Sequence, residues 1–327
     1  MTHLLFPDLF FAKPLHGIQL ILGNGRDEHK QEREGDTVAT LNVWQETEEP
    51  CYTTKPIWKK EERGERYQSL LKLYKTSRGF SLKIDCEGEG AFEFTPNGIG
   101  IYWKPSGTGP AHYFQTLGLS LWLELQGTPC IHANGLAVGE TAIGIIAPSR
   151  TGKTTLTAAL MQSGLQMMSD DMMALHRETE GWRVYPGWPQ FRMWPDTAQY
   201  YSGSDLDRLE KVHKRFEKRV VNLEKSDGFY FCRHSKPLKQ LYLLDRRETE
   251  KGEIWVQDIS PGEALLHLLQ NSILGDIYQV LGIEQARLKR LAGLLDGIAL
   301  KKISYPSGLD HLPKVCKQIQ VELLKGQ

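Results

Sequence analysis

The sequence predicts an α/β protein in which a β-rich N-terminal region precedes an α/β core. Residues 1–110 consist of short alternating, β-branched or aromatic runs separated by polar turns, which is typical of half-buried strands. From residue 111 onward, helical patterns alternate with short apolar strands, and residues 144–176 follow the order strand, loop, helix, strand. This order is characteristic of α/β cores. We therefore expect a β-rich region over residues 1–110 and an α/β domain over residues 111–327.

Composition limits the classes of protein to which the chain can belong. Its 327 residues are enough for about two domains. The 40 basic and 40 acidic residues cancel, so no overall field draws the protein to nucleic acid or to an anionic membrane, and we expect neither as a partner. No run of 18 apolar residues is present, and the N-terminus lacks the basic region and cleavage site of a signal peptide.

The cysteines favour a reducing compartment. Five are scattered along the chain without a C-x-x-C pair, at positions 51, 86, 130, 232 and 316. Neither a disulfide framework nor a zinc site fits this spacing. We expect a cytoplasmic protein.

Local patterns predict most elements. The expected N-terminal strands are residues 5–11, 17–22, 38–44, 80–85 and 91–94, with a hairpin turn at 96–98. Two charged stretches, 23–36 and 59–66, are expected as exposed loops or faces. Helices are expected at 112–125, 156–164, 205–217 and 261–271. The first has leucines at 117, 121 and 125, the second ends at Gly164, the third is charged and the fourth is capped by Ser260. The expected later strands are 144–146, 165–168, 172–176 and 182–184, and a hairpin of 241–244 with 254–259.

The strongest motif is APSRTGKTT, residues 147–155, between the strand at 144–146 and the following helix. It fits a phosphate loop with Ala at the first position, where Gly is usual and where a Cβ restricts positive φ. Such a loop turns backbone N–H groups around a polyphosphate, and the helix N-terminus adds its positive end. The candidate ATP-binding residues are Ala147, Pro148, Ser149, Arg150, Thr151, Gly152, Lys153, Thr154 and Thr155. Lys153 would reach the β- and γ-phosphates, and Thr154 would offer its hydroxyl to Mg²⁺.

An acidic pair, Asp170 and Asp171, follows the next strand. Strand ends in open α/β sheets face the ligand crevice, so this pair is expected beside the phosphate loop. One carboxylate can lie near Mg²⁺ while the other accepts a proton from an attacking hydroxyl. We expect Thr154 and Asp171 to hold the metal and Asp170 to act as the base. The sequence is equally compatible with exchanged roles for the two aspartates.

These residues, together with further motifs, resemble a known family. His132 precedes the loop, Ser149 lies in it, and the stretches YPGWPQFRMWPD at 185–196, EKRV at 217–220 and PLKQLYLLDRR at 237–247 follow. Over about residues 110–275 the pattern is similar to HPr kinase/phosphorylase, and more closely to HPr serine kinase-related P-loop kinases without its usual N-terminal domain. The resemblance implies an HPr-kinase/PEP-carboxykinase-like core and homo-oligomers. It also implies that His132 supports the acidic pair and that Arg192 and Arg219 contact transferred phosphate.

Motif and resemblance together predict an ATP- and Mg²⁺-dependent kinase that transfers the γ-phosphoryl group to a hydroxyl. The acceptor would be a Ser or Thr of a peptide or protein, or a serine-like small molecule. The candidate catalytic residues are His132, Lys153, Asp170, Asp171, Arg192 and Arg219. Two alternatives are a nucleotide-binding regulatory module and an NTPase, neither of which transfers phosphate to an acceptor.

Overall fold

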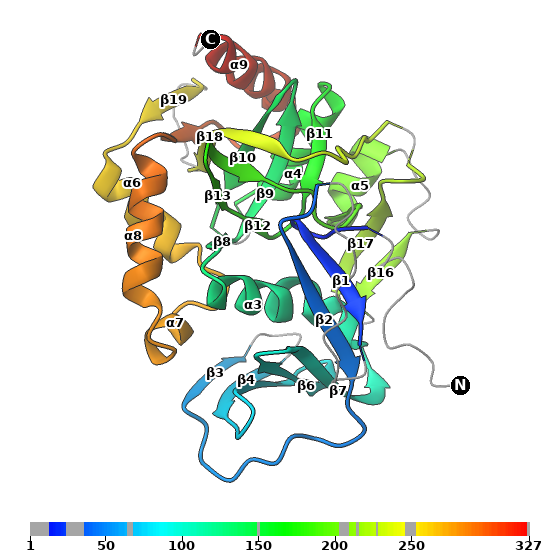
Figure 1. Ribbon diagram of the computed structural model, residues 1–327. Coiled ribbons are helices and arrows are strands. Elements are labelled where there is room, and N and C mark those ends of the chain that lie inside the picture. Colours follow the sequence, from blue (N-terminus) through cyan, green and yellow to red (C-terminus); the bar gives the residue numbers. More distant parts are fainter. Residues whose placement is uncertain are drawn as a thin grey trace. The chain divides into compact units, whose positions relative to one another are not determined.

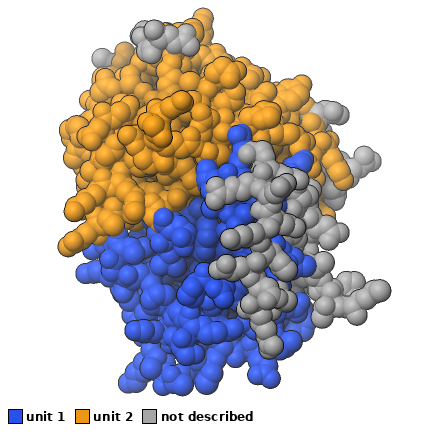
Figure 2. All heavy atoms as spheres, in the orientation of Figure 1, with its two compact units in different colours: residues 1–126, 213–216, 276–284 blue, residues 127–212, 217–275, 285–327 orange. Residues whose placement is uncertain are grey.

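The computed structural model describes residues 13–23, 36–63, 68–148, 151–202, 209–213, 216–226, 228–245 and 253–325. The protein is mixed α/β and divides into two compact units, coloured separately in Figure 2. Unit 1 comprises residues 1–126, 213–216 and 276–284, and unit 2 comprises residues 127–212, 217–275 and 285–327. The division expected after residue 110 stays a prediction. No helix among the described residues combines the length and apolar character needed to cross a bilayer.

Unit 1 is built on one seven-stranded sheet (Figure 1). Its order is β1 (Ile18–Leu22), β2 (Ala39–Gln45), β7 (Gly98–Gly107), β6 (Gly88–Thr95), β5 (Phe80–Asp85), β4 (Gln68–Lys75) and β3 (Trp58–Arg63). The first three strands are parallel, and the others form an antiparallel meander. The predicted strands at 17–22, 38–44, 80–85 and 91–94 are confirmed, as is the hairpin, in which Thr95 pairs with Gly98.

Two charged stretches of unit 1 have different outcomes. Residues 59–63 of the predicted exposed segment belong to the edge strand β3, whose side chains are mostly exposed. Charged side chains on an edge strand discourage pairing with other chains. Residues 24–35, most of the other predicted loop, and the predicted strand at 5–11 lie outside the described residues.

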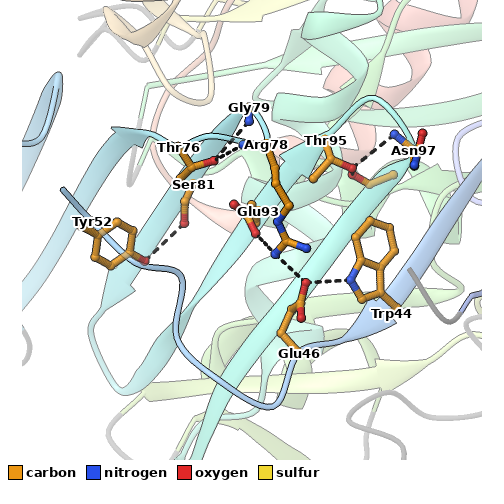
Figure 3. A network of polar contacts seen from close by, with 11 residues as sticks. Trp44, Glu46, Tyr52, Thr76, Arg78, Gly79, Ser81, Glu93, Thr95 and Asn97 are labelled. Carbon is orange, nitrogen blue, oxygen red and sulfur yellow. Dashed lines mark hydrogen bonds and ion pairs between the residues drawn. The ribbon is translucent and has the colours of Figure 1, made fainter. Parts of the chain in front are cut away.

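A polar network inside unit 1 neutralises a buried carboxylate (Figure 3). The side chain of Glu93 is only 3% exposed and is paired with Arg78. The same guanidinium lies 2.7 Å from Glu46, which also accepts a 2.9 Å hydrogen bond from the Trp44 indole. A buried carboxylate without such partners would be strongly destabilising. We assign these side chains to the stability of unit 1.

The predicted helix at 112–125 is confirmed as a run of three segments. They are α2 (Pro110–Tyr113), a π-helical segment η1 (Phe114–Gly118) and α3 (Leu119–Leu125). Leu117 and Leu125 are only partly buried, whereas Leu119, Leu121 and Leu123 are fully buried. The burial therefore does not follow the single stripe that the spacing of the leucines predicts.

Unit 2 contains an eight-stranded mixed sheet. Its main order is β11 (Gln166–Ser169), β9 (Ala133–Val138), β10 (Thr141–Ile146), β18 (Lys236–Leu244), β14 (Gly181–Val184) and β13 (His176–Glu178). Strand β20 (Leu300–Ser304) pairs with β18 and with β19 (Trp255–Asp258). Strands β10, β18 and β20 are parallel, and β9 runs antiparallel between β10 and β11.

Helices cover both faces of this sheet (Figure 1). Ile143 and Ile145 of β10 belong to the core that contains α4 (Lys153–Gln162) and α9 (Leu312–Lys325). The alternate residues Ala142 and Ile146 belong to the core that contains α6 (Pro261–Gln270) and α8 (Glu284–Leu295). This alternation is the two-residue period of a strand buried on both faces. Shorter elements of unit 2 are β8 (Cys130–Ile131) paired with β12 (Met173–Ala174), α5 (Pro195–Ser202) and η3 (Leu309–His311), whereas α7 (Ile277–Val280) belongs to unit 1.

Two predictions for the second part of the chain are wrong. The charged helix at 205–217 is replaced, in its described residues, by strands β16 (Glu210–His213) and β17 (Phe216–Asn222), which form a sheet with β15 (Gln190–Met193). Burial along β17 alternates with a period of two, so pairing with β15 overrides the helix propensity of its Lys and Glu residues. The predicted hairpin of 241–244 with 254–259 does not form either. Strand β20 lies between β18 and β19, parallel to the first and antiparallel to the second.

Candidate active site

The loop between β10 and α4 forms a helix N-terminus that is open to an anion. Within the described part of the loop, only Gly152 has a positive φ (99°), so Ala147 carries no backbone strain at the first motif position. Gly152 is the N-cap of α4 and supplies no side-chain hydrogen bond. The N-cap residue therefore gives the first N–H groups of the helix no side-chain acceptor, and these groups lie at the positive end of the helix dipole. Ser149 and Arg150 lie outside the described residues.

Helix α4 is fixed at its other end by Gly164, as predicted. Gly164 has φ 102°, and its N–H donates to the Met161 carbonyl at 3.0 Å. The N–H of Leu165 donates to the Leu160 carbonyl at 3.1 Å. This pair of bonds is a Schellman motif, which the left-handed conformation of glycine permits. The motif ends the helix, and Leu156 and Leu160 of α4 pack in one core with the β10 residues Ile143 and Ile145.

Lys153 lies almost buried at the start of α4, with 8% of its surface exposed. Its Nζ donates to Asp171 Oδ1 at 2.8 Å and to Asn134 Oδ1 at 3.0 Å. A buried ammonium is tolerated only when it is paired and hydrogen-bonded, and these two oxygens meet that need. The predicted phosphate-loop lysine and the predicted acidic pair therefore lie in direct contact.

Asn134 joins three elements and was missed by sequence reasoning. It is fully buried in β9, and its Oδ1 accepts from both Lys153 Nζ and the backbone N–H of Asp171, each at 3.0 Å. Its Nδ2 donates to Thr157 Oγ1 of α4 at 3.1 Å. Because β9 is antiparallel to β10 and β11, its first residues lie beside the last residues of both neighbours. The sequence offers one clue, since Asn134 is two residues after His132 and would lie on the same side of an extended chain.

His132 is held against the backbone of the acidic pair. Its Nδ1 is 2.9 Å from the Asp171 carbonyl oxygen, which can only accept, so Nδ1 carries the proton. Its Nε2 is then an acceptor, 3.9 Å from Asp171 Oδ1. Partial burial and the positive charge of Lys153 lower the pKa of His132 to about 4. The imidazole is therefore neutral at neutral pH. Asp171 itself has φ 61°, a left-handed conformation that few non-glycine residues adopt.

The two aspartates have different acid strengths. Burial and the neighbouring Asp171 charge raise the pKa of Asp170 to about 6. Burial acts in the same direction on Asp171, but the positive charges of Lys153 and Lys218 outweigh it and hold the pKa of Asp171 well below its usual range. Asp170 therefore titrates close to neutral pH, while Asp171 stays ionised. Asp170 Oδ2 also accepts a 2.9 Å hydrogen bond from the backbone N–H of Arg192, which fixes β15 beside the site.

The structure separates the two predicted arginines. Arg192 is 7% exposed, and its Nη1 lies 3.8 Å from Asp171 Oδ2. In the β15–β17 ladder Arg192 pairs with Val220 and Met193 pairs with Arg219, so Arg219 points to the other face, with the buried Met193. Arg219 is itself 9% exposed, and its Nε has no hydrogen-bond partner among the described residues. Only Arg192 of the two is in contact with the acidic pair.

The loop threonines divide their contacts. Thr151 Oγ1 donates to the Pro148 carbonyl at 2.6 Å and closes the loop. Thr155 Oγ1 lies 3.1 Å from Thr197 Oγ1 of α5, which directs it away from the acidic pair. Thr154, in the first turn of α4, is 8% exposed.

Hydroxyl and carboxylate oxygens are ligands that suit Mg²⁺, so Thr154 and Asp171 fit a magnesium ion. The described residues contain no cluster of three or more His, Cys, Asp or Glu side chains that could hold a metal by themselves. A magnesium ion at this position would need further oxygens from phosphate and water.

Comparisons with known proteins add little. No family model matches the chain, and no curated protein sequence matches it. Among solved structures, the chain is similar to the Hpr(Ser) kinase/phosphatase from Coxiella burnetii, with 14% sequence identity and a TM-score of 0.34. The match covers 60% of this chain and 91% of that one. Membership in the HPr kinase family stays a prediction.

Proposed function

We propose that this chain is an ATP- and Mg²⁺-dependent kinase with an HPr-kinase-like P-loop core, which transfers the γ-phosphoryl group to a hydroxyl. The acceptor class is a Ser or Thr of a peptide or protein, or a serine-like small molecule. One observation carries the proposal: a buried lysine at an uncapped helix N-terminus contacts one carboxylate of an acidic pair. Phosphoryl transfer depends mainly on positioning and on compensating charge, and this arrangement supplies both.

The phosphate-binding part of the proposal rests on α4. Its free N–H groups and the helix dipole suit the β-phosphate, and Lys153 can exchange Asp171 for a phosphate oxygen. Asn134 would keep the lysine stem oriented through this exchange, because its 3.0 Å bond does not depend on Asp171. Thr154 and Asp171 would hold Mg²⁺, which supplies positive charge to the phosphate oxygens when it is bound.

The difference in pKa favours one of the two role assignments for the aspartates. A general base works best when its pKa is near the working pH, and Asp170, with its raised pKa of about 6, meets that condition. Asp171, whose pKa is held low, suits a permanently charged metal ligand. His132 would position Asp171 through its bond to the backbone carbonyl.

Transfer of labelled phosphate from [γ-³²P]ATP tests the proposal directly. The purified chain is incubated with MgCl₂ and with serine- or threonine-containing peptides or free serine. Asp170→Asn should lower the transfer rate by about 10²–10⁴-fold, the usual contribution of a general base. Lys153→Ala should abolish transfer. Lys211→Ala, which alters a lysine that is 40% exposed and paired with Glu217, is the control and should leave the rate unchanged.

The other outcomes identify the alternatives. Binding of ATP without transfer to any acceptor would indicate a regulatory module. Release of ADP without a labelled acceptor would indicate an NTPase. Full activity of both Lys153→Ala and Asp170→Asn, with unchanged unfolding curves, would show that the site is wrongly assigned.

A further inference from the structure

We infer that Lys218 is a third cation of this site and contacts the terminal phosphoryl group of bound nucleoside triphosphate. The inference rests on the proposed function and adds Lys218, which lies in the EKRV stretch but is not among the candidate site residues. It follows from the register of β15 and β17, from the aromatic contact of Lys218 and from the charge balance around Asp171.

The strand register places Lys218 on the same face as Arg192. Arg192 pairs with Val220, so these two side chains share a face of the sheet. Lys218 is two residues before Val220 in β17 and therefore lies on that face as well. Arg192 reaches Asp171 from this face, with 3.8 Å between Nη1 and Oδ2. Lys218 thus belongs to the face of the β15–β17 pair that is turned to the acidic pair, whereas Arg219 does not.

A contact with Trp194 supports this placement. Trp194 follows Arg192 by two residues, and the Lys218 Nζ lies 5.7 Å from the centroid of its indole ring. A cation over an indole face is held by the ring quadrupole without being neutralised. Among the described residues, no carboxylate lies within ion-pair distance of Lys218. Its positive charge therefore remains available to a ligand.

The charge balance shows which kind of ligand this is. Lys153 and Arg192 lie 2.8 Å and 3.8 Å from the carboxylate of Asp171, and Lys218 lies on the same strand face as Arg192. Among the described residues, Asp170 is the second carboxylate of the site. Three cations next to two carboxylates in the described part of the site favour an anionic ligand.

The position of the excess charge points to the terminal phosphate. Lys153 is the first residue of α4 and also contacts Asp171, so a polyphosphate that starts on the first turn of α4 and extends to Asp171 ends beside Arg192, on the strand face that also carries Lys218. The terminal phosphoryl group is the most highly charged part of a nucleoside triphosphate, and a diphosphate lacks it. Lys218 should therefore favour the triphosphate over the diphosphate.

Calorimetric titration of the full chain with Mg·AMPPNP and with Mg·ADP tests this assignment. Lys218→Met keeps an unbranched side chain over Trp194 and removes only the charge. It should weaken Mg·AMPPNP binding by about tenfold, as expected for one charge-assisted hydrogen bond, and change Mg·ADP binding by less than about twofold. Lys218→Arg should retain most of the affinity for Mg·AMPPNP. Lys211→Met is the matched control, because Lys211 pairs with Glu217, which points to the opposite face from Lys218, and it should change neither affinity.

The results separate this inference from the proposed function. If the wild-type chain binds both nucleotides and Lys218→Met weakens both equally or neither, the Lys218 assignment is wrong while the kinase proposal stands. The second of these results would indicate that Lys218 serves an anionic group on the acceptor instead. If the wild-type chain binds neither nucleotide, the proposed function fails, and the assignment fails with it.

Discussion

We expect Asn134→Leu to lower the free energy of unfolding of unit 2 by more than the loss of a single buried hydrogen bond would. The substitution keeps a side chain of similar length and removes three hydrogen bonds, which join β9 to Lys153, to the backbone of Asp171 and to Thr157. A hydrogen bond to a charged group contributes about 1.5–3 kcal/mol, and each neutral one contributes about 1 kcal/mol. The free energy of unfolding should therefore fall by about 4 kcal/mol.

Urea-induced unfolding at neutral pH, followed by tryptophan fluorescence, measures this loss. Thr157→Val is the matched control, because it removes only the bond to Asn134 Nδ2 and should cost about 1 kcal/mol. If Asn134→Leu were no more destabilising than Thr157→Val, the bonds from Asn134 to Lys153 and Asp171 would contribute nothing. The view of Asn134 as the link between the lysine and the acidic pair would then be refuted.

Three further predictions follow from the same structure. Calorimetry should show no binding of Mg²⁺ alone and binding of Mg²⁺ together with nucleotide. The reason is that Asp171 is paired with Lys153 and the described part of the site has more cations than carboxylates. Binding of Mg²⁺ to the nucleotide-free protein would contradict this prediction. Because the pKa of His132 falls from 6.5 to about 4 on folding, the unfolded chain binds a proton in this range that the folded chain does not, so His132 lowers the Tm as pH drops from 6.5 to 4. The raised pKa of Asp170 acts in the opposite direction, so the contribution of His132 is measured as the difference between the wild type and His132→Gln. Over this pH range the Tm of His132→Gln should fall less than the wild-type Tm. The same pH dependence of Tm in both proteins would show that the lowered pKa of His132 is not the cause. Gly144→Ala should lower the free energy of unfolding by about 1–3 kcal/mol, because its Cβ would lie 2.6–2.7 Å from buried leucine and methionine side chains. Gly293→Ala in α8, where nothing lies near the new Cβ, should raise the free energy of unfolding by about 0.5–1 kcal/mol. Thermal unfolding of the two glycine variants measures both stability changes. A Tm for Gly144→Ala at or above the wild-type value would contradict the predicted destabilisation.

Features whose cause lies within a few residues could be predicted from the sequence. The turn at 96–98, the Ser260 cap and the end of α4 at Gly164 each depend on local backbone chemistry, and the structure shows all three. Elements that depend on distant partners could not be predicted. The strand that separates β18 from β19 is far along the chain, at Leu300–Ser304, and no local pattern places it there.

The candidate site shows the same division. Lys153 and the acidic pair come together because they lie at the ends of elements that follow one another in the chain, and His132 joins them because β9 starts at the same edge of the sheet. Asn134 was missed because an asparagine in a buried strand belongs to no motif. The sequence pointed to Arg219 and not to Lys218. Neighbouring residues of a strand lie on opposite faces, and only the register of β17 with β15 shows which of the two lies on the face of Arg192.

A crystal structure of the full chain with Mg·AMPPNP tests most directly whether Lys153 and α4 bind a triphosphate. We expect the phosphates along the first turn of α4, with the Lys153 Nζ moved from Asp171 to a phosphate oxygen and Asp170 facing the terminal phosphoryl group. A triphosphate bound elsewhere, or Lys153 still bonded to Asp171 with no phosphate in reach, would contradict the proposed site.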